Sequence, residues 1–329
     1  MNKKILLLAG ILALGATTFA AEGTRDLLDT FKDVIAPKED ITGYWNQGFK
    51  AYTDTEAKDD RQMRLQNEIG LNLTDKVSVA LRTRTYMDYP GKAQKSDDNF
   101  RFDMTYNNGK IGDTELGLSQ RVRMYKAGSN AGIYSYRPVV DFSSYIGADY
   151  ADASLEFTHV RNTSGRTVNE TQNDIKADYA YSTDGTRYSD DVQKILYDID
   201  MGWTLGYGFS TEIEFLGSIT TSTGKATESA LYTALFYDYN LYTSADEATT
   251  LAFHTEASIT PVKFNHEDNE LHSDSTLVNT ETYIELNHEW TNNFSTYGTV
   301  GLLTEDDFKT HTSNVGAQGY VAVGLSYAM

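Results

Sequence analysis

Basic residues are concentrated in one part of this 329-residue chain, whereas acidic residues occur throughout it. Every arginine lies at or before Arg187, and from residue 188 onward 4 lysines stand against 21 acidic residues. The polar positions of alternating segments in the first half carry Arg64, Arg82, Arg84, Arg101, Arg121, Arg123 and Arg137. Those of the second half carry Asp198, Asp200, Glu212, Glu214, Asp238, Glu256, Glu285 and Glu289. We call these sets the basic wall and the acidic wall. Facing each other across water, they would create a transverse field that filters solutes by size and polarity.

Catalysis is a weaker interpretation of the polar residues. His254, Glu256 and Ser258 share one face of a segment, each two residues from the next. Acid–base or nucleophilic catalysis requires such groups to meet at one substrate atom, and side chains spaced along a single strand need not converge. We therefore predict that the protein is not an enzyme.

A metal site is also considered, in a loop of the second half. Its candidate ligands are His266, Glu267, Asp268, His272 and Asp274. Oxygen-rich loops bind divalent cations, but these residues lack a fixed ligand spacing, so a solvated acidic loop is favoured. We predict no metal and no other cofactor. The absence of cysteine from the sequence excludes a disulfide scaffold.

The N-terminus has the three parts of a secretory signal peptide. Lys3 and Lys4 are basic, residues 5–14 are apolar, and Thr18-Phe19-Ala20 provides a small-residue cleavage site. The apolar run is short for a transmembrane helix. Removal of residues 1–20 leaves 329 − 20 = 309 residues with a net charge of 26 − 47 = −21. This charge argues against nucleic-acid binding.

Polar and apolar residues alternate repeatedly along the rest of the chain. The alternating segments have about nine to fourteen residues, longer than most soluble strands and close to a tilted membrane strand. Because the faces opposite the apolar ones are continuously charged, we place the apolar residues toward lipid. Strands are predicted at residues 43–53, 61–72, 76–87, 98–106, 113–126, 133–143, 151–161, 191–202, 208–220, 229–241, 249–259, 276–289, 293–303 and 316–329.

Short and long connections alternate between these strands. Tight turns are predicted at residues 73–76, 107–110, 203–206 and 290–293. A long external loop is predicted at residues 162–190, and the alternation of residues 175–181 is assigned to a local hairpin within it. The predicted fold is all-β, a transmembrane antiparallel up-and-down β-barrel of 14 strands over residues 41–329.

Individual residues add detail to this prediction. Pro138 lies inside a predicted strand, where its missing N–H donor should require a bulge or a bend. Trp45, Trp203 and Trp290 all fall at the periplasmic ends of strands, the position of an aromatic girdle. The alternation of the last strand continues to Met329, so we expect that strand to close the barrel.

Residues 21–40 follow a different pattern. Leu27, Leu28, Phe31, Val34 and Ile35 have helical spacing, and Pro37 follows them. A short periplasmic amphipathic helix or arm is the favoured prediction. A plug inside the lumen is the alternative.

Several short motifs resemble one known family. They are Arg64-Leu65-Gln66, Asn72-Leu73-Thr74-Asp75-Lys76, Arg82-Thr83-Arg84, Tyr106-Asn107-Asn108-Gly109-Lys110 and Arg121-Val122. In these motifs the chain resembles the fusobacterial major outer-membrane porins of the FomA type, most clearly over residues 60–145. The resemblance implies a voltage-sensitive general diffusion porin that forms a trimer and sometimes serves as an adhesin. The chain departs from the family in its arginine-free second half and in ending on methionine.

The predicted function is an outer-membrane porin with a water-filled channel for small hydrophilic solutes and ions. An open lumen is expected because barrels of about eight strands are filled by side chains, whereas those of about sixteen are open. The predicted partners are outer-membrane lipid, the solutes, further copies in a homotrimer, and host or bacterial surface ligands of the external loops. The alternative is a barrel-anchored adhesin or structural protein with no significant channel.

Overall fold

The computed structural model describes residues 41–53, 62–88, 99–127, 131–162, 192–220, 225–265, 270–272, 277–307 and 316–329. The predicted signal peptide, the predicted helix within residues 21–40 and nearly all of the predicted loop at 162–190 lie outside these residues. So do His266, Glu267, Asp268 and Asp274 of the candidate metal site. Among the described residues, no helix is long and apolar enough to cross a membrane.

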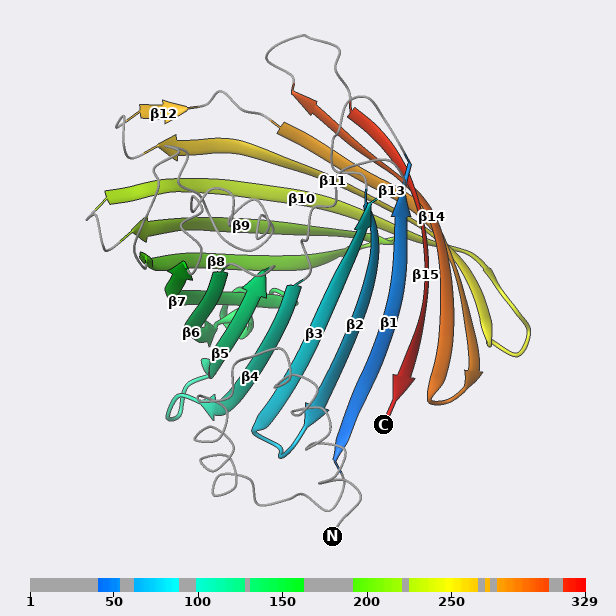
Figure 1. The fold of residues 1–329 in the computed structure, drawn as a ribbon, viewed down its shortest axis with the longest axis horizontal. Coiled ribbons are helices and arrows are strands. Elements are labelled where there is room, and N and C mark those ends of the chain that lie inside the picture. Colours follow the sequence, from blue (N-terminus) through cyan, green and yellow to red (C-terminus); the bar gives the residue numbers. More distant parts are fainter. Residues whose placement is uncertain are drawn as a thin grey trace.

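Fourteen long strands form the wall of the structure (Figure 1). They are β1 (Thr42–Tyr52), β2 (Gln62–Asn72), β3 (Val77–Asp88), β4 (Asn99–Lys110), β5 (Gly117–Ala127), β6 (Ala131–Asp141), β7 (Tyr150–Asn162), β8 (Val192–Gly206), β9 (Phe209–Thr220), β10 (Lys225–Thr243), β11 (Thr249–Asn265), β13 (Leu277–Thr291), β14 (Phe294–Asp307) and β15 (Gly316–Ala328). Two short elements accompany them: β12 (Glu270–His272), which pairs with the end of β11, and α3 (Ser143–Ile146), which joins β6 to β7.

The sheet closes on itself through antiparallel pairs. β10 pairs with β11, β11 with β13, and β15 with β1. At the closure the Met329 amide donates to the Gly43 carbonyl at 2.8 Å, and the Gly43 amide donates to the Met329 carbonyl at 3.1 Å. A closed barrel pairs the backbone groups that an open sheet edge would leave without partners in lipid. The prediction of a 14-stranded antiparallel barrel is confirmed.

Side-chain exposure in the wall is the reverse of that in a soluble protein. Outward-facing Val300 and Val323 are 66% and 57% exposed, whereas inward-facing Arg123 and Glu156 are 6% and 4% exposed. Soluble proteins seldom bury arginine and glutamate in this way. A transmembrane barrel places apolar residues toward lipid and polar residues toward its interior. The fold is therefore a transmembrane β-barrel, as the alternation predicted.

Tyrosines on the inner face pack against glycines of neighbouring strands. Tyr150 of β7 lies over its registered partner Gly202 of β8, so closely that a Cβ atom on Gly202 would be 2.2 Å from the tyrosine ring. Tyr44 of β1 has the same relation to Gly70 of β2, with a corresponding distance of 2.3 Å. Glycine in a strand allows this close approach because it has no side chain. The glycines thus determine where these rings lie.

Two predicted turns lie a few residues from the observed ones. Residues 107–110 continue β4 through a bulge, and residues 111–116 make the connection to β5. Residues 203–206 belong to β8, and the turn is formed by Tyr207 and Gly208, where φ is 55° and 86°. Positive φ at both positions is typical of a tight hairpin turn. The polar and glycine residues at these sites favoured turns in the sequence. In the structure the backbone there still pairs with the next strand, so the turns follow a few residues later.

Pro138 is accommodated without the predicted bulge. Within the described strands the β6–β7 register is the same on both sides of Pro138, while Arg137 and Pro138 have no registered partner on β7. On its other side Pro138 faces Gln120 of β5 in a continuous ladder. The missing N–H therefore lies at a local gap in pairing, and of the predicted bulge or bend the bulge is absent.

Candidate functional site: the inner wall of the barrel

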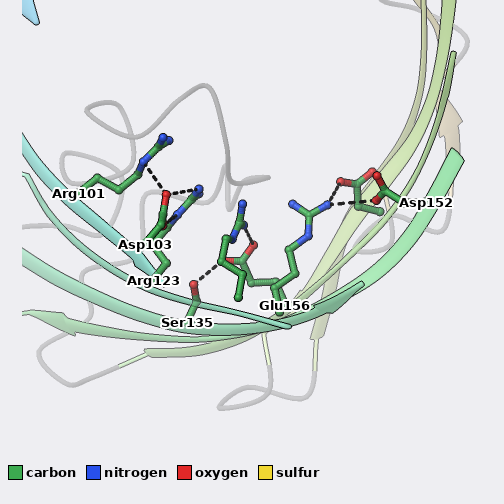
Figure 2. Close-up of polar contacts among 9 residues, drawn as sticks. Arg101, Asp103, Arg123, Ser135, Asp152 and Glu156 are labelled. Atoms are coloured by element: carbon green, nitrogen blue, oxygen red, sulfur yellow. Dashed lines mark hydrogen bonds and ion pairs between the residues drawn. The ribbon is translucent and has the colours of Figure 1, made fainter. Parts of the chain in front are cut away.

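Asp103 on β4 joins two arginines of the basic wall (Figure 2). Arg123 donates from Nε to Asp103 Oδ1 at 2.6 Å and from Nη2 to Oδ2 at 3.2 Å. Arg101 Nε lies 3.0 Å from Asp103 Oδ2. The side chains of Arg123, Asp103 and Arg101 are only 7%, 12% and 16% exposed. One carboxylate therefore balances part of the charge of two nearly buried guanidinium groups.

Glu156 on β7 forms an ion pair with a third arginine, Arg121 of β5 (Figure 2). Arg121 Nη2 donates to Glu156 Oε2 at 3.1 Å, and the Ser135 hydroxyl donates to the other carboxylate oxygen. Glu156 was absent from the predicted acidic wall. The polar alternation of Asp152, Ser154 and Glu156 in the sequence is the signal that could have found it.

Arg137 links the basic wall to the acidic wall. Its Nη2 donates to Asp198 Oδ2 on β8 at 2.7 Å and lies 3.9 Å from Asp152 Oδ1 on β7. Asp198, predicted to belong to the acidic wall, is therefore paired with a basic residue. The two walls meet at this ion pair, between β6 and β8.

The seven arginines of the basic wall lie on consecutive strands, from β2 to β6. Arg82 is registered opposite Arg101, and Arg121 opposite Arg137. Arg84 donates from Nε to Gln66 Oε1 at 2.7 Å, and Arg64 lies opposite Lys50 of β1. The structure thus brings these residues together, as expected from the sequence. Their part in lining a channel stays a prediction.

Four acidic residues face one another in register across neighbouring strands. This carboxylate row consists of Asp141 of β6, Asp152 of β7, Asp200 of β8 and Glu214 of β9. Glu212, two residues before Glu214, accepts a hydrogen bond of 2.7 Å from the Tyr150 hydroxyl. Like charges directly opposite each other repel. The row therefore concentrates negative charge on one part of the inner wall.

The remaining acidic-wall residues lie on β10, β11 and β13. Asp238 Oδ1 is 2.5 Å from His254 Nδ1, and Glu256 accepts a bond of 3.1 Å from the Tyr232 hydroxyl. Glu285 accepts a bond of 3.2 Å from the Thr299 hydroxyl, and Glu289 lies near the end of β13, opposite Ser295. Glu256 and Glu285 thus accept from hydroxyl groups, whereas Asp238 contacts a histidine ring.

The structure shows the partners of the three residues weighed for catalysis. His254 contacts Asp238, Glu256 accepts from Tyr232, and Ser258 donates to the Asn279 carbonyl at 3.5 Å. The Tyr232 side chain is hydrogen-bonded to both Glu256 and Ser258, whereas His254 contacts Asp238, so His254 has a different partner from the other two.

Sequence reasoning missed an ion pair across the barrel closure. Lys50 Nζ on β1 is 3.3 Å from Glu281 Oε1 on β13 and lies 3.6 Å from the ring centroid of Tyr320 on β15. Such a contact is stabilised by both the carboxylate and the ring face. Lys50 and Glu281 are 231 residues apart, so only the closed register brings them together.

No family model matches the chain, and no curated protein matches its sequence. Among solved structures, the chain is similar to KdgM porin at 8% identity over 87% of this chain and 99% of that one, with a TM-score of 0.35. It is similar to the outer membrane channel DcaP of Acinetobacter baumannii at 9% identity over 88% and 96% of the two chains, with a TM-score of 0.38. BamA from Haemophilus ducreyi, lacking POTRA domains 1–3, gives 12% identity over 88% and 71%, with a TM-score of 0.42. These similarities concern the barrel architecture alone.

Proposed function

We propose that the protein is an outer-membrane porin whose barrel encloses a water-filled channel for small hydrophilic solutes and ions. The observation that carries this proposal is the charged inner wall, above all the carboxylate row. Carboxylates registered side by side are costly in a dry interior unless cations or water solvate them. A hydrated lumen meets that need. The wall has 14 strands, nearer to the open barrels of about sixteen strands than to the filled barrels of about eight.

The proposed location follows from the fold together with the N-terminus. Closed barrels with an apolar outer band belong to bacterial outer membranes, and residues 1–20 would direct the chain there. In this arrangement residues 21–40 lie in the periplasm, and the loop at 162–190 lies outside, where it is available to surface ligands. The motifs resembling FomA-type porins favour general diffusion over transport of one dedicated solute.

We infer that the unequal balance of charge makes the channel prefer cations. On β4 to β8, the arginines at positions 101, 121, 123 and 137 are within ion-pair distance of Asp103, Glu156 or Asp198. Asp200, Glu212 and Glu214 add negative charge beside these pairs. A lumen with surplus negative charge attracts cations and repels anions.

Replacing Arg82, Arg84, Arg121 and Arg123 together with alanine tests this proposal. Loss of four positive charges should free Glu156 from Arg121 and leave Asp103 with Arg101 as its remaining arginine partner. The conductance should change, and the zero-current potential in a salt gradient should shift in the direction that indicates stronger cation preference. A matched Lys76→Ala variant, altered in the exposed β2–β3 turn, should behave like the wild type. Unaltered ion preference in the fourfold variant would contradict the role of the basic wall.

A further inference from the structure

The outer face of the barrel carries a pair of amide side chains at mid-height. Gln47 is the sixth of the eleven residues of β1, and Asn67 is the sixth of the eleven residues of β2. The two are registered opposite each other in a ladder without bulges. Tyr44 and Glu68, whose positions alternate with theirs, are hydrogen-bonded on the inner face at 2.8 Å. Gln47 and Asn67 therefore point outward, on the same side as the apolar residues.

The hydrogen bond between the two amides satisfies only part of their capacity. Gln47 Nε2 donates to Asn67 Oδ1 at 2.9 Å. Each amide group has two N–H donors and a carbonyl oxygen that accepts, so the Gln47 carbonyl and the Asn67 NH₂ group remain available for bonding. The hydrocarbon core of a membrane offers them no water. A bare lipid contact is therefore an unfavourable environment for this pair.

Two other sets of outward polar groups are bonded within the chain. Gln120, the fourth residue of β5, uses both ends of its amide: its carbonyl accepts from the Tyr136 hydroxyl at 2.8 Å, and its NH₂ group donates to Asn108 at 2.9 Å. The hydroxyl groups of Thr255 and Thr282 bond each other across β11 and β13 at 2.8 Å. The pair on β1 and β2 differs in presenting a free acceptor and a free donor side by side.

Apolar residues surround this pair on the outer face. Phe49 and Leu65 are registered on one side of it, and Ile69 is registered opposite Trp45 on the other. Thr83, in the middle of β3, lies opposite Asn67. An apolar rim excludes lipid headgroups and water, and within it an interchain hydrogen bond gains strength from the low dielectric constant.

We propose that the outer face of β1 to β3 is a contact surface between copies of this chain, with Gln47 and Asn67 at its centre. A second copy offers the same adjacent donor and acceptor, so the surface is complementary to itself. The Asn67 NH₂ group of one copy donates to the Gln47 carbonyl of the other. Acyl chains of lipid offer neither group. The proposal rests on the transmembrane barrel and does not depend on conduction.

Cysteine cross-linking locates the contact, because the natural chain contains no cysteine. Leu65→Cys places one thiol in the rim, and Leu235→Cys places one on β10, where Leu235 is 46% exposed on the outer face. Both proteins, folded and reconstituted in lipid, are treated with a flexible bismaleimide. Cross-linked dimers are expected from Leu65→Cys and not from Leu235→Cys, because each chain carries one thiol. The reverse pattern, or no cross-linking of either variant, would overturn the proposal.

Substitution of the amides tests their role. Association in detergent is followed by light scattering for the wild type, for Gln47→Leu with Asn67→Leu, and for the control Thr255→Val with Thr282→Val. The amide variant is expected to need a concentration at least about tenfold higher to associate, in line with the strength of interchain polar bonds in membranes. The threonine variant should match the wild type. A monomeric wild type, or an amide variant that associates equally well, would contradict the proposal. If the amide variant does not fold, the cross-linking result decides.

Discussion

Asp103 is bonded to two arginines in a part of the wall that water hardly reaches. Arg123 approaches it through two nitrogens and Arg101 through one. Removing one member of a buried ion pair leaves the other charge without compensation, which costs far more than the loss of an exposed pair. The contribution of this carboxylate to stability is therefore testable by itself.

We predict that Asp103→Asn lowers the free energy of unfolding by about 3 kcal/mol, because two guanidinium groups lose their shared anion. The measurement is denaturant unfolding of the purified barrel in detergent. The control is Glu115→Gln, which breaks a pair with Lys110 whose side chains are 61% and 59% exposed. Loss of an exposed pair should cost less than about 1 kcal/mol. Equal effects of the two substitutions would contradict the account of the buried network.

Asp246 lies in the turn between β10 and β11, outside the membrane-spanning wall, and its pKa is the subject of a second prediction. Its carboxylate accepts from the Ser244 hydroxyl at 2.5 Å and from the Ala248 N–H at 3.2 Å. The hydrogen bond from Ser244 has the larger effect and the one from Ala248 the smaller, and both lower the pKa of Asp246 below its ordinary value. The stabilisation is present above the unfolded pKa and is lost as pH falls through the folded one. Ser244→Ala should raise this pKa in a carboxyl-carbon NMR titration, and an unchanged titration would contradict the assignment.

The alternation of polar and apolar residues predicted the strands because the pattern of each strand is contained in its own segment of sequence. Its period of two is visible in a single segment, and strands such as β1 and β2 begin and end within one residue of expectation. β10 and β11 were predicted too short at 229–241 and 249–259. β10 extends from Lys225 to Thr243 by pairing with β9 and β11, and β11 extends to Asn265 by pairing with β10. Such pairing depends on a partner strand, which a local pattern does not contain.

Contacts between tyrosine and glycine hold neighbouring strands in register. Gly202→Ala would place a Cβ atom 2.2 Å from the Tyr150 ring and should lower the free energy of unfolding by about 1–3 kcal/mol, as overpacking does. Gly298→Ala is the matched control, because a Cβ atom there meets no other atom within 4 Å. Denaturant unfolding of the two variants provides the comparison. A Gly202→Ala barrel as stable as the Gly298→Ala barrel would show that the close packing is unimportant.

The last strand closes the barrel, and its final residues contribute directly. Tyr327 is registered with Trp45 of β1 on one side and with Phe294 of β14 on the other. We predict that deletion of residues 327–329 blocks assembly, whereas Met329→Phe is tolerated because the backbone bonds to Gly43 remain. The readout is the amount of folded, heat-modifiable protein in the outer membrane. Normal levels of the deletion variant would contradict the importance of this closure.

The closed barrel could be predicted as a whole, but its inner contacts could not. Counting alternating segments and turns yields fourteen strands, and the charge of each polar residue assigns it to the basic wall or the acidic wall. Which acid meets which arginine depends on strand register across the wall. For this reason the contacts of Arg121 with Glu156 and of Arg137 with Asp152 and Asp198 were not predicted. The pair of Lys50 and Glu281 requires closure itself.

Conduction is the central claim about the molecule, and recording from planar lipid bilayers tests it most directly. The purified protein is first shown to be folded by its heat-modifiable migration, so that a negative result cannot be ascribed to misfolding. We predict stepwise increases in current as single barrels insert, with a zero-current potential that indicates cation preference. Folded protein that inserts into the bilayer and gives no current steps would contradict the porin assignment.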